Sequence, residues 1–137
     1  MLNELLKVGI VVQTNPSKGT ARVRITDADD EITYELPVIV RASFRDKAYW
    51  MPDIGECVVC IFSGEGLEQG FILGAIYNAQ DKTPTDEQAE RMVKFKDGTV
   101  IEYDRDSHRL YIHSVGDIEI VSDTHITLVA PRIDLNP

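Results

Sequence analysis

The sequence predicts an all-β protein, because two features recur along its 137 residues. Runs rich in β-branched residues are bounded by Gly, Pro, Asn and Asp, which is typical of short strands separated by turns. Long stretches with the i, i+3, i+4 apolar spacing of an amphipathic helix are missing. The composition, with 43% hydrophobic and 27% charged residues, is that of a chain that folds around a core.

The first part of the chain contains five candidate strands separated by turn residues. These strands are Val8 to Gln13, Thr20 to Thr26, Glu35 to Val40, Glu56 to Phe62 and Phe71 to Tyr77. Five short strands in about 80 residues suit a small closed barrel, because closure removes exposed sheet edges. We therefore expect an oligonucleotide/oligosaccharide-binding barrel, the OB-fold, over residues 1–78.

A linker is expected over residues 79–92, because this stretch is polar and contains Pro84. Beyond it, Asp97-Gly98 lies between two alternating runs and predicts a β-hairpin. The last region, residues 93–137, is therefore expected to continue as β-structure.

The tail contains short apolar pairs that start 8, 8 and 7 residues apart. The pairs are Leu110 and Ile112, Ile118 and Ile120, Ile126 and Leu128, and Ile133 and Leu135. Polar residues alternate with them, so each strand is expected to have one apolar side, which a single short strand cannot bury. Three identical chains wound about a common axis would bury all of these stripes. The pattern predicts a homotrimeric, triple-stranded β-helix, with a dimeric sandwich as the alternative.

Cys57 and Cys60 form a C-x-x-C pair, a spacing found in zinc sites and in redox-active pairs. They lie in an expected strand, where residues three apart point to opposite faces. No second cysteine pair or nearby histidine supplies further ligands. We therefore expect thiols packed in the core, and neither a metal nor another cofactor.

The formal net charge of −9 argues against a nucleic-acid partner, because such affinity depends on clustered Lys and Arg. No enzyme is expected either. Ser63 lacks the preceding glycine of a nucleophile elbow, and Glu65 and Glu68 lie in a glycine-rich loop where carboxylates are usually solvated. No apolar run reaches the roughly 18 residues of a membrane-spanning helix, so synthesis as a soluble cytoplasmic chain is expected.

Two motifs resemble those of the phage baseplate assembly protein V or tail spike family, relatives of the valine-glycine-repeat spikes of type VI secretion. The first is similar to a W-x-P-x-x-G-E strand and comprises Trp50, Pro52, Gly55 and Glu56. The second is similar to a G-x-x-L-G-x-x-Y-N strand and comprises Gly70, Leu73, Gly74, Tyr77 and Asn78. The resemblance extends over nearly the whole chain.

The resemblance implies an N-terminal OB barrel and a homotrimeric β-helix at the centre of a virion tail baseplate, in contact with hub proteins of the baseplate or tail tube. It further implies synthesis in the cytoplasm of a bacterial host, and a spike that sheath contraction drives into the target cell envelope. The alternative is a trimeric OB-fold module that recognises a glycan or a protein. His108, His113 and His125 do not form the H-x-H tip site of some members, so no metal is expected at the tip. Either a small cap protein docks on the tip, or the chain termini fold over Leu135 and no cap exists.

Overall fold

The computed structural model describes residues 5–27, 29–64 and 66–136. The chain forms two compact units, Met1–Thr83 and Pro84–Pro137. The strands are β1 (Leu6–Asn15), β2 (Thr20–Ile25), β3 (Leu36–Pro37), β4 (Cys57–Phe62), β5 (Gly70–Ala75), β6 (Glu90–Lys94), β7 (Val100–Asp104) and β8 (Arg109–His113). The expectation of an all-β chain is confirmed. Over the described ranges, no helix is long and apolar enough to cross a membrane.

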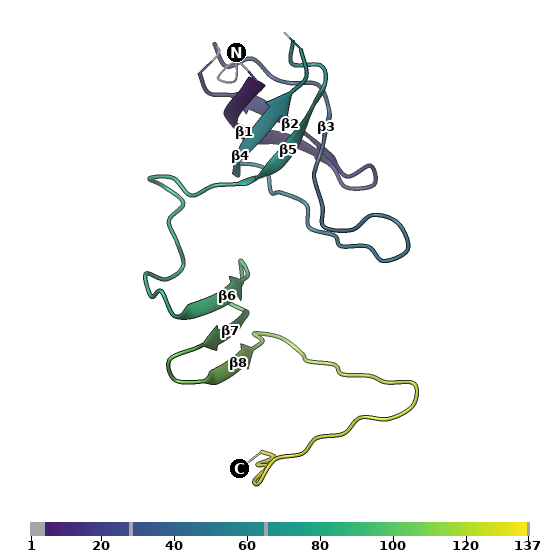
Figure 1. Ribbon diagram of the computed structural model, residues 1–137, viewed down its shortest axis with the longest axis vertical. Helices are drawn as coiled ribbons and strands as arrows, with labels where there is room; N and C mark the ends of the chain where they lie inside the picture. The colour runs from purple at the N-terminus through teal and green to yellow at the C-terminus, as the bar shows by residue number, and fades with distance from the viewer. Residues whose placement is uncertain (1–4, 28, 65, 137) are drawn as a thin grey trace. The chain divides into compact units, whose positions relative to one another are not determined.

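The first unit is a nearly closed, OB-like barrel of five strands (Figure 1). Its strands follow the order β3-β2-β1-β4-β5, and all neighbours in this sheet are antiparallel. The two edges of this sheet, β3 and β5, are joined by the residues that follow β3. Val38 forms a parallel bridge with Ile72 of β5, and the Ile39 amide donates to the Ile72 carbonyl at 3.0 Å. The prediction of an OB barrel in the first part of the chain is therefore confirmed.

The third strand is shorter than the predicted segment Glu35 to Val40, since only Leu36–Pro37 is assigned to it. Pro37 has no amide hydrogen and cannot donate to a sheet ladder. The following residues pair one at a time instead, with Val38 donating to the Gly19 carbonyl at 2.9 Å. The proline thus divides the predicted strand into a short ladder and a closing bridge.

The barrel core consists of alternate residues from all five strands. Its buried members are Val11, Ala21, Val23, Ile25, Leu36, Val58, Cys60, Phe62 and Ile72. The hydroxyl of the buried polar residue Thr33 both accepts and donates a hydrogen bond. Its Oγ1 accepts from the Val23 amide at 3.0 Å and donates to the Tyr34 carbonyl at 2.8 Å. Burial of that hydroxyl therefore leaves no unpaired donor.

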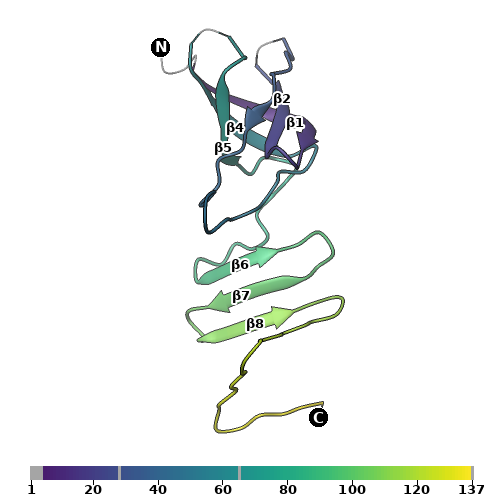
Figure 2. The same ribbon diagram turned by 90° about the vertical axis from the view of Figure 1, so that its right-hand side faces the viewer.

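The second unit contains an antiparallel sheet of three strands in the order β6-β7-β8 (Figure 2). The predicted hairpin lies between β6 and β7, where Gly98 has φ = 98°. The Asp97 carboxylate accepts from the Thr99 amide at 2.9 Å, and this bond holds the pKa of Asp97 below its ordinary value. Strand β6 begins at Glu90, inside the predicted linker 79–92, because Glu90 and Arg91 pair with β7.

After β8 the chain continues in an extended path without a ladder of its own (Figure 2). Residues 114–136 contain neither helix nor strand, so the apolar pairs predicted around residues 118, 126 and 133 have no strand partner within the single chain. Their assembly with other chains stays a prediction.

Candidate functional site

One face of the three-stranded sheet is apolar and open. The apolar residues are Val93, Ile101 and Ile112 in one row across the strands, and Tyr103 and Leu110 in the next row, which Arg91 completes on β6. Their exposed fractions range from 39% at Tyr103 to 64% at Leu110. An antiparallel sheet normally packs its apolar face against a core. We call these five residues the apolar face, and nothing in the described part of the second unit covers it.

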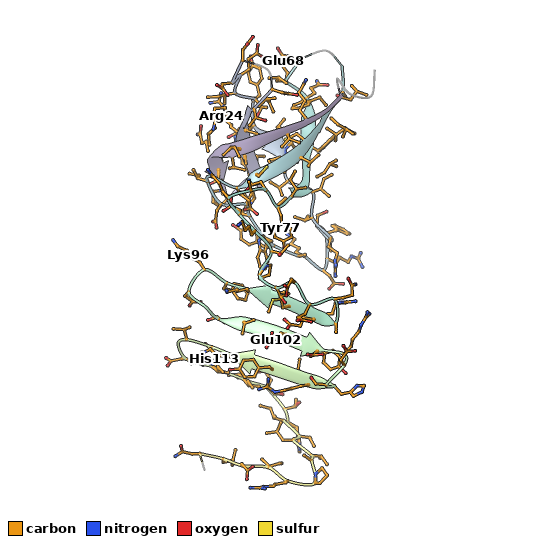
Figure 3. The ribbon with its side chains drawn as sticks, turned by 90° about the vertical axis from the view of Figure 1, so that its left-hand side faces the viewer. Arg24, Glu68, Tyr77, Lys96, Glu102 and His113 are labelled. Carbon is orange, nitrogen blue, oxygen red and sulfur yellow. The ribbon has the colours of Figure 1, made fainter. Side chains whose placement is uncertain are left out.

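The opposite side of the same sheet is largely polar. It carries Glu102 in the middle strand and Tyr111 and His113 in the last, two of which are labelled in Figure 3. The Tyr111 and His113 rings are stacked with centroids 6.1 Å apart, and the Arg109 guanidinium lies 4.5 Å from the Tyr111 ring centroid. Contacts of this kind are compatible with water, so the sheet has one apolar side and one largely polar side.

All eight residues predicted for the trimer axis are exposed in the single chain. The pair Leu110 and Ile112 lies in β8 on the apolar face, with Tyr111 on the other side, as the alternation predicts. The remaining six belong to the extended tail, where exposure runs from 49% at Ile126 to 83% at Leu135. The structure therefore brings the first pair into a common surface with β6 and β7, and leaves the other three pairs unassembled.

Sequence reasoning missed apolar residues in two places. Val93, Ile101 and Tyr103 extend the apolar face across β6 and β7, and the hairpin pattern around Asp97-Gly98 could have placed them there by alternation. In the tail, Val121 and Val129 are 85% and 88% exposed. They follow the predicted pairs directly at the same eight-residue spacing, which is the signal that identifies them.

Several residues of the two family-like motifs have structural roles in the barrel. Pro52 is buried, and Gly55 occupies a turn with φ = 98°. The Glu56 carboxylate accepts from the Asp53 amide at 2.9 Å. After the last barrel strand, the Asn78 side-chain oxygen accepts from the amides of Gln80 and Asp81 at 2.9 and 2.6 Å. These residues fix two turns at the ends of β4 and β5.

Of the other five motif residues, one lies in close contact with the neighbouring strand and four lie on the surface. Gly70 is buried at the start of β5, where a Cβ would overlap the Ile61 carbonyl oxygen. Trp50, Leu73, Gly74 and Tyr77 are exposed, and Tyr77 is labelled below the barrel strands in Figure 3. An exposed Trp and Tyr are typical of protein contact surfaces.

The two cysteines lie in β4 with Cys57 opposite Ile10 and Cys60 opposite Lys7 of β1. Both are free and buried, and burial raises the pKa of the Cys60 thiol to about 11. A thiol of this kind is neutral at pH 7 and a poor nucleophile or metal ligand. Among residues 5–27, 29–64 and 66–136, no three His, Cys, Asp or Glu side chains cluster as a metal site would require.

Comparison with known proteins places this geometry in a family. Residues 7–77, which run from the second residue of β1 to just beyond β5, match the model of the type VI secretion system/phage-baseplate injector OB domain. The chain is also 25% identical to the Spike protein of Escherichia phage P2 over 132 residues, which is 96% of this chain. It spans 61% of the length of that relative. The chain therefore belongs to the type VI secretion system/phage-baseplate injector OB domain family.

Proposed function

We propose that this chain is a homotrimeric central spike of a contractile injection machine. The observation that carries the proposal is the apolar face, formed by Val93, Ile101, Tyr103, Leu110 and Ile112 on one open side of a single sheet. Large exposed apolar patches mark protein contact sites. Three parallel chains would turn three such faces toward a common axis and exclude water from all of them.

The tail supports the same assembly. Ile118, Ile126 and Ile133 are each at least 49% exposed in one chain, and their extended segments have no hydrogen-bonded strand neighbour there. Strands from two other chains would satisfy these edges and bury the apolar pairs, which gives a triple-stranded β-helix. Separation of one chain would then require breaking the contacts of all three, so the assembly is stiff.

Stiffness is what a force-bearing part requires. In this proposal, sheath contraction pushes the trimer against the target cell envelope, and the spike transmits force and catalyses no reaction. The barrel joins the spike to the other baseplate proteins, which places the protein in the virion tail baseplate. The family match and the similarity to a phage Spike protein support this role.

Light scattering of the purified full chain tests the assembly directly, and the expected mass is three times the chain mass of 15.4 kDa. Ile118→Asp would bring three carboxylates into a water-poor axis, and each uncompensated charge costs several kcal/mol. This variant should dissociate, whereas the neighbouring Glu119→Ala should remain trimeric. A monomeric or dimeric unchanged chain, or equal effects of the two substitutions, would contradict the proposal.

A further inference from the structure

The long connection between β3 and β4 contains an ordered hairpin that extends beyond the barrel strands (Figures 1 and 2). Ser43 and Lys47 form an antiparallel bridge, and the Ala48 amide donates to the Ala42 carbonyl at 3.0 Å. These contacts close a tight tip around Phe44. We call residues 39–50 the docking hairpin.

Both ends of the docking hairpin are fixed to the barrel. At its start the Ile39 amide donates to Ile72 of β5 at 3.0 Å. Shortly after its end the Gly55 amide donates to the Val11 carbonyl of β1 at 2.8 Å. A surface held in this way loses little conformational entropy when a partner binds, which favours affinity.

The side chains of the docking hairpin have the composition of an interaction hot spot. Phe44, Tyr49 and Trp50 are 77%, 70% and 61% exposed. The Arg45 guanidinium lies 5.4 Å from the centroid of the Phe44 ring. Aromatic residues and Arg are the side chains enriched at the energetic centres of protein interfaces.

The docking hairpin also has a local charge opposite to that of the chain. It contains Arg41, Arg45 and Lys47 against the single carboxylate of Asp46, while the whole chain has a formal charge of −9. An acidic partner would be attracted at this hairpin and repelled by most of the remaining surface. Such a distribution fixes the orientation in which the partner docks.

We infer that the docking hairpin binds an acidic surface, containing a pocket for an aromatic side chain, on another protein of the baseplate. This inference rests on the proposed function, since it names the partner contact of the same spike. A hairpin-to-hairpin contact between copies of this chain fits less well, because it would place like charges together, and the oligomeric mass of the variants tests any other contact between copies. Anionic lipid also fits less well, because most of the chain is acidic and would be repelled by such a surface.

The test uses tail particles assembled in a producing strain that lacks this chain. Purified full-length protein is added to these particles, and binding is measured by co-sedimentation. We compare the triple variant R41E/R45E/K47E with the matched variant K82E/K96E/R105E, which makes the same charge change at exposed positions outside the hairpin. F44A tests the aromatic tip without any change in charge.

The hairpin triple variant should bind about tenfold to a hundredfold more weakly than the unchanged chain, and F44A should also bind more weakly. The matched variant should bind as the unchanged chain does, and all variants should keep the same mass by light scattering. Added salt should weaken binding of the unchanged chain more than that of the hairpin triple variant.

Four results would overturn the inference. The hairpin triple variant could bind the particles as tightly as the matched variant, or it could lose its oligomeric mass, which would make the hairpin a contact between copies. Loss of binding to phosphatidylglycerol vesicles with unchanged binding to tail particles would assign the hairpin to a membrane. If the unchanged chain itself did not bind the particles, the proposed function would fail together with the inference.

Discussion

Two glycines of the same barrel strand should respond in opposite ways to an added methyl group. Gly70 begins β5 opposite Phe62, and a Cβ at this position would overlap the Ile61 carbonyl oxygen and lie 2.7 Å from Cδ1 of Phe62. Backbone cannot move aside as a flexible side chain can, so β4 and β5 would have to separate locally. Gly74, in the same strand, has no atom within 4 Å of the corresponding Cβ position.

The expected size follows from the cost of overpacking a core. A substitution that forces backbone shifts typically lowers the free energy of unfolding by about 1 to 3 kcal/mol. For a unit of this size each kcal/mol corresponds to roughly 4 to 8 °C in Tm. Gly70→Ala should therefore lower the Tm of the barrel by roughly 5 to 20 °C. Gly74→Ala should leave it unchanged or raise it slightly, because alanine restricts the unfolded chain.

Tryptophan fluorescence provides the assay, since Trp50 is the single tryptophan of the chain and belongs to the barrel unit. Both variants and the unchanged protein are unfolded by heat and by urea at one fixed protein concentration, because subunit association shifts apparent stability. Equal midpoints for Gly70→Ala and Gly74→Ala would refute the reasoning. That result would mean that β4 and β5 do not approach as closely as the structure shows.

Three further predictions follow from the second unit and the barrel core. Ile101→Asp on the apolar face should dissociate the trimer, whereas Glu102→Ala on the opposite face should not, as size-exclusion chromatography with light scattering can show. The Cys60 thiol, whose pKa is raised to about 11 by burial, should resist iodoacetamide at pH 8 until urea unfolds the barrel. Hydrogen bonds from backbone amides lower the pKa values of Asp97 and Asp104 below the ordinary 3.8. Their contribution to stability is present above that value and is lost as the pH falls through the lowered pKa. Hydrogen exchange of the amides in the β6–β7 and β7–β8 turns should therefore accelerate below about pH 4. Equal exchange rates at pH 3 and pH 6, after correction for the intrinsic rates, would contradict this prediction.

Local patterns predicted the five barrel strands, the β6–β7 hairpin and β8, whereas the predicted strands around residues 118, 126 and 133 are not formed within the single chain. Alternation placed Leu110 and Ile112 on one side of β8 and Tyr111 on the other, because side chains along a strand alternate regardless of what surrounds it. Asp97-Gly98 predicted the hairpin correctly, since few residue pairs adopt the backbone angles of a tight turn. The boundary of β6 was predicted too late, because Glu90 is polar and belongs to the strand only through its pairing with Asp104.

The docking hairpin is the clearest example of a feature that local sequence patterns did not predict. The sequence indicated only that residues 41–55 lie between two predicted strands, since neither alternation nor composition distinguishes a mobile connection from an ordered one. Anchoring depends on Ile72 and Val11, residues of two other strands that are distant along the chain. By itself the sequence determined the strands, their alternating faces and the motifs of the family. Only the tertiary structure decided that the faces of β6, β7 and β8 join into one open apolar surface and that the β3–β4 connection forms a hairpin bonded to β5 and β1. Register and long-range hydrogen bonds arise from pairing between strands and not from the residues of any one strand.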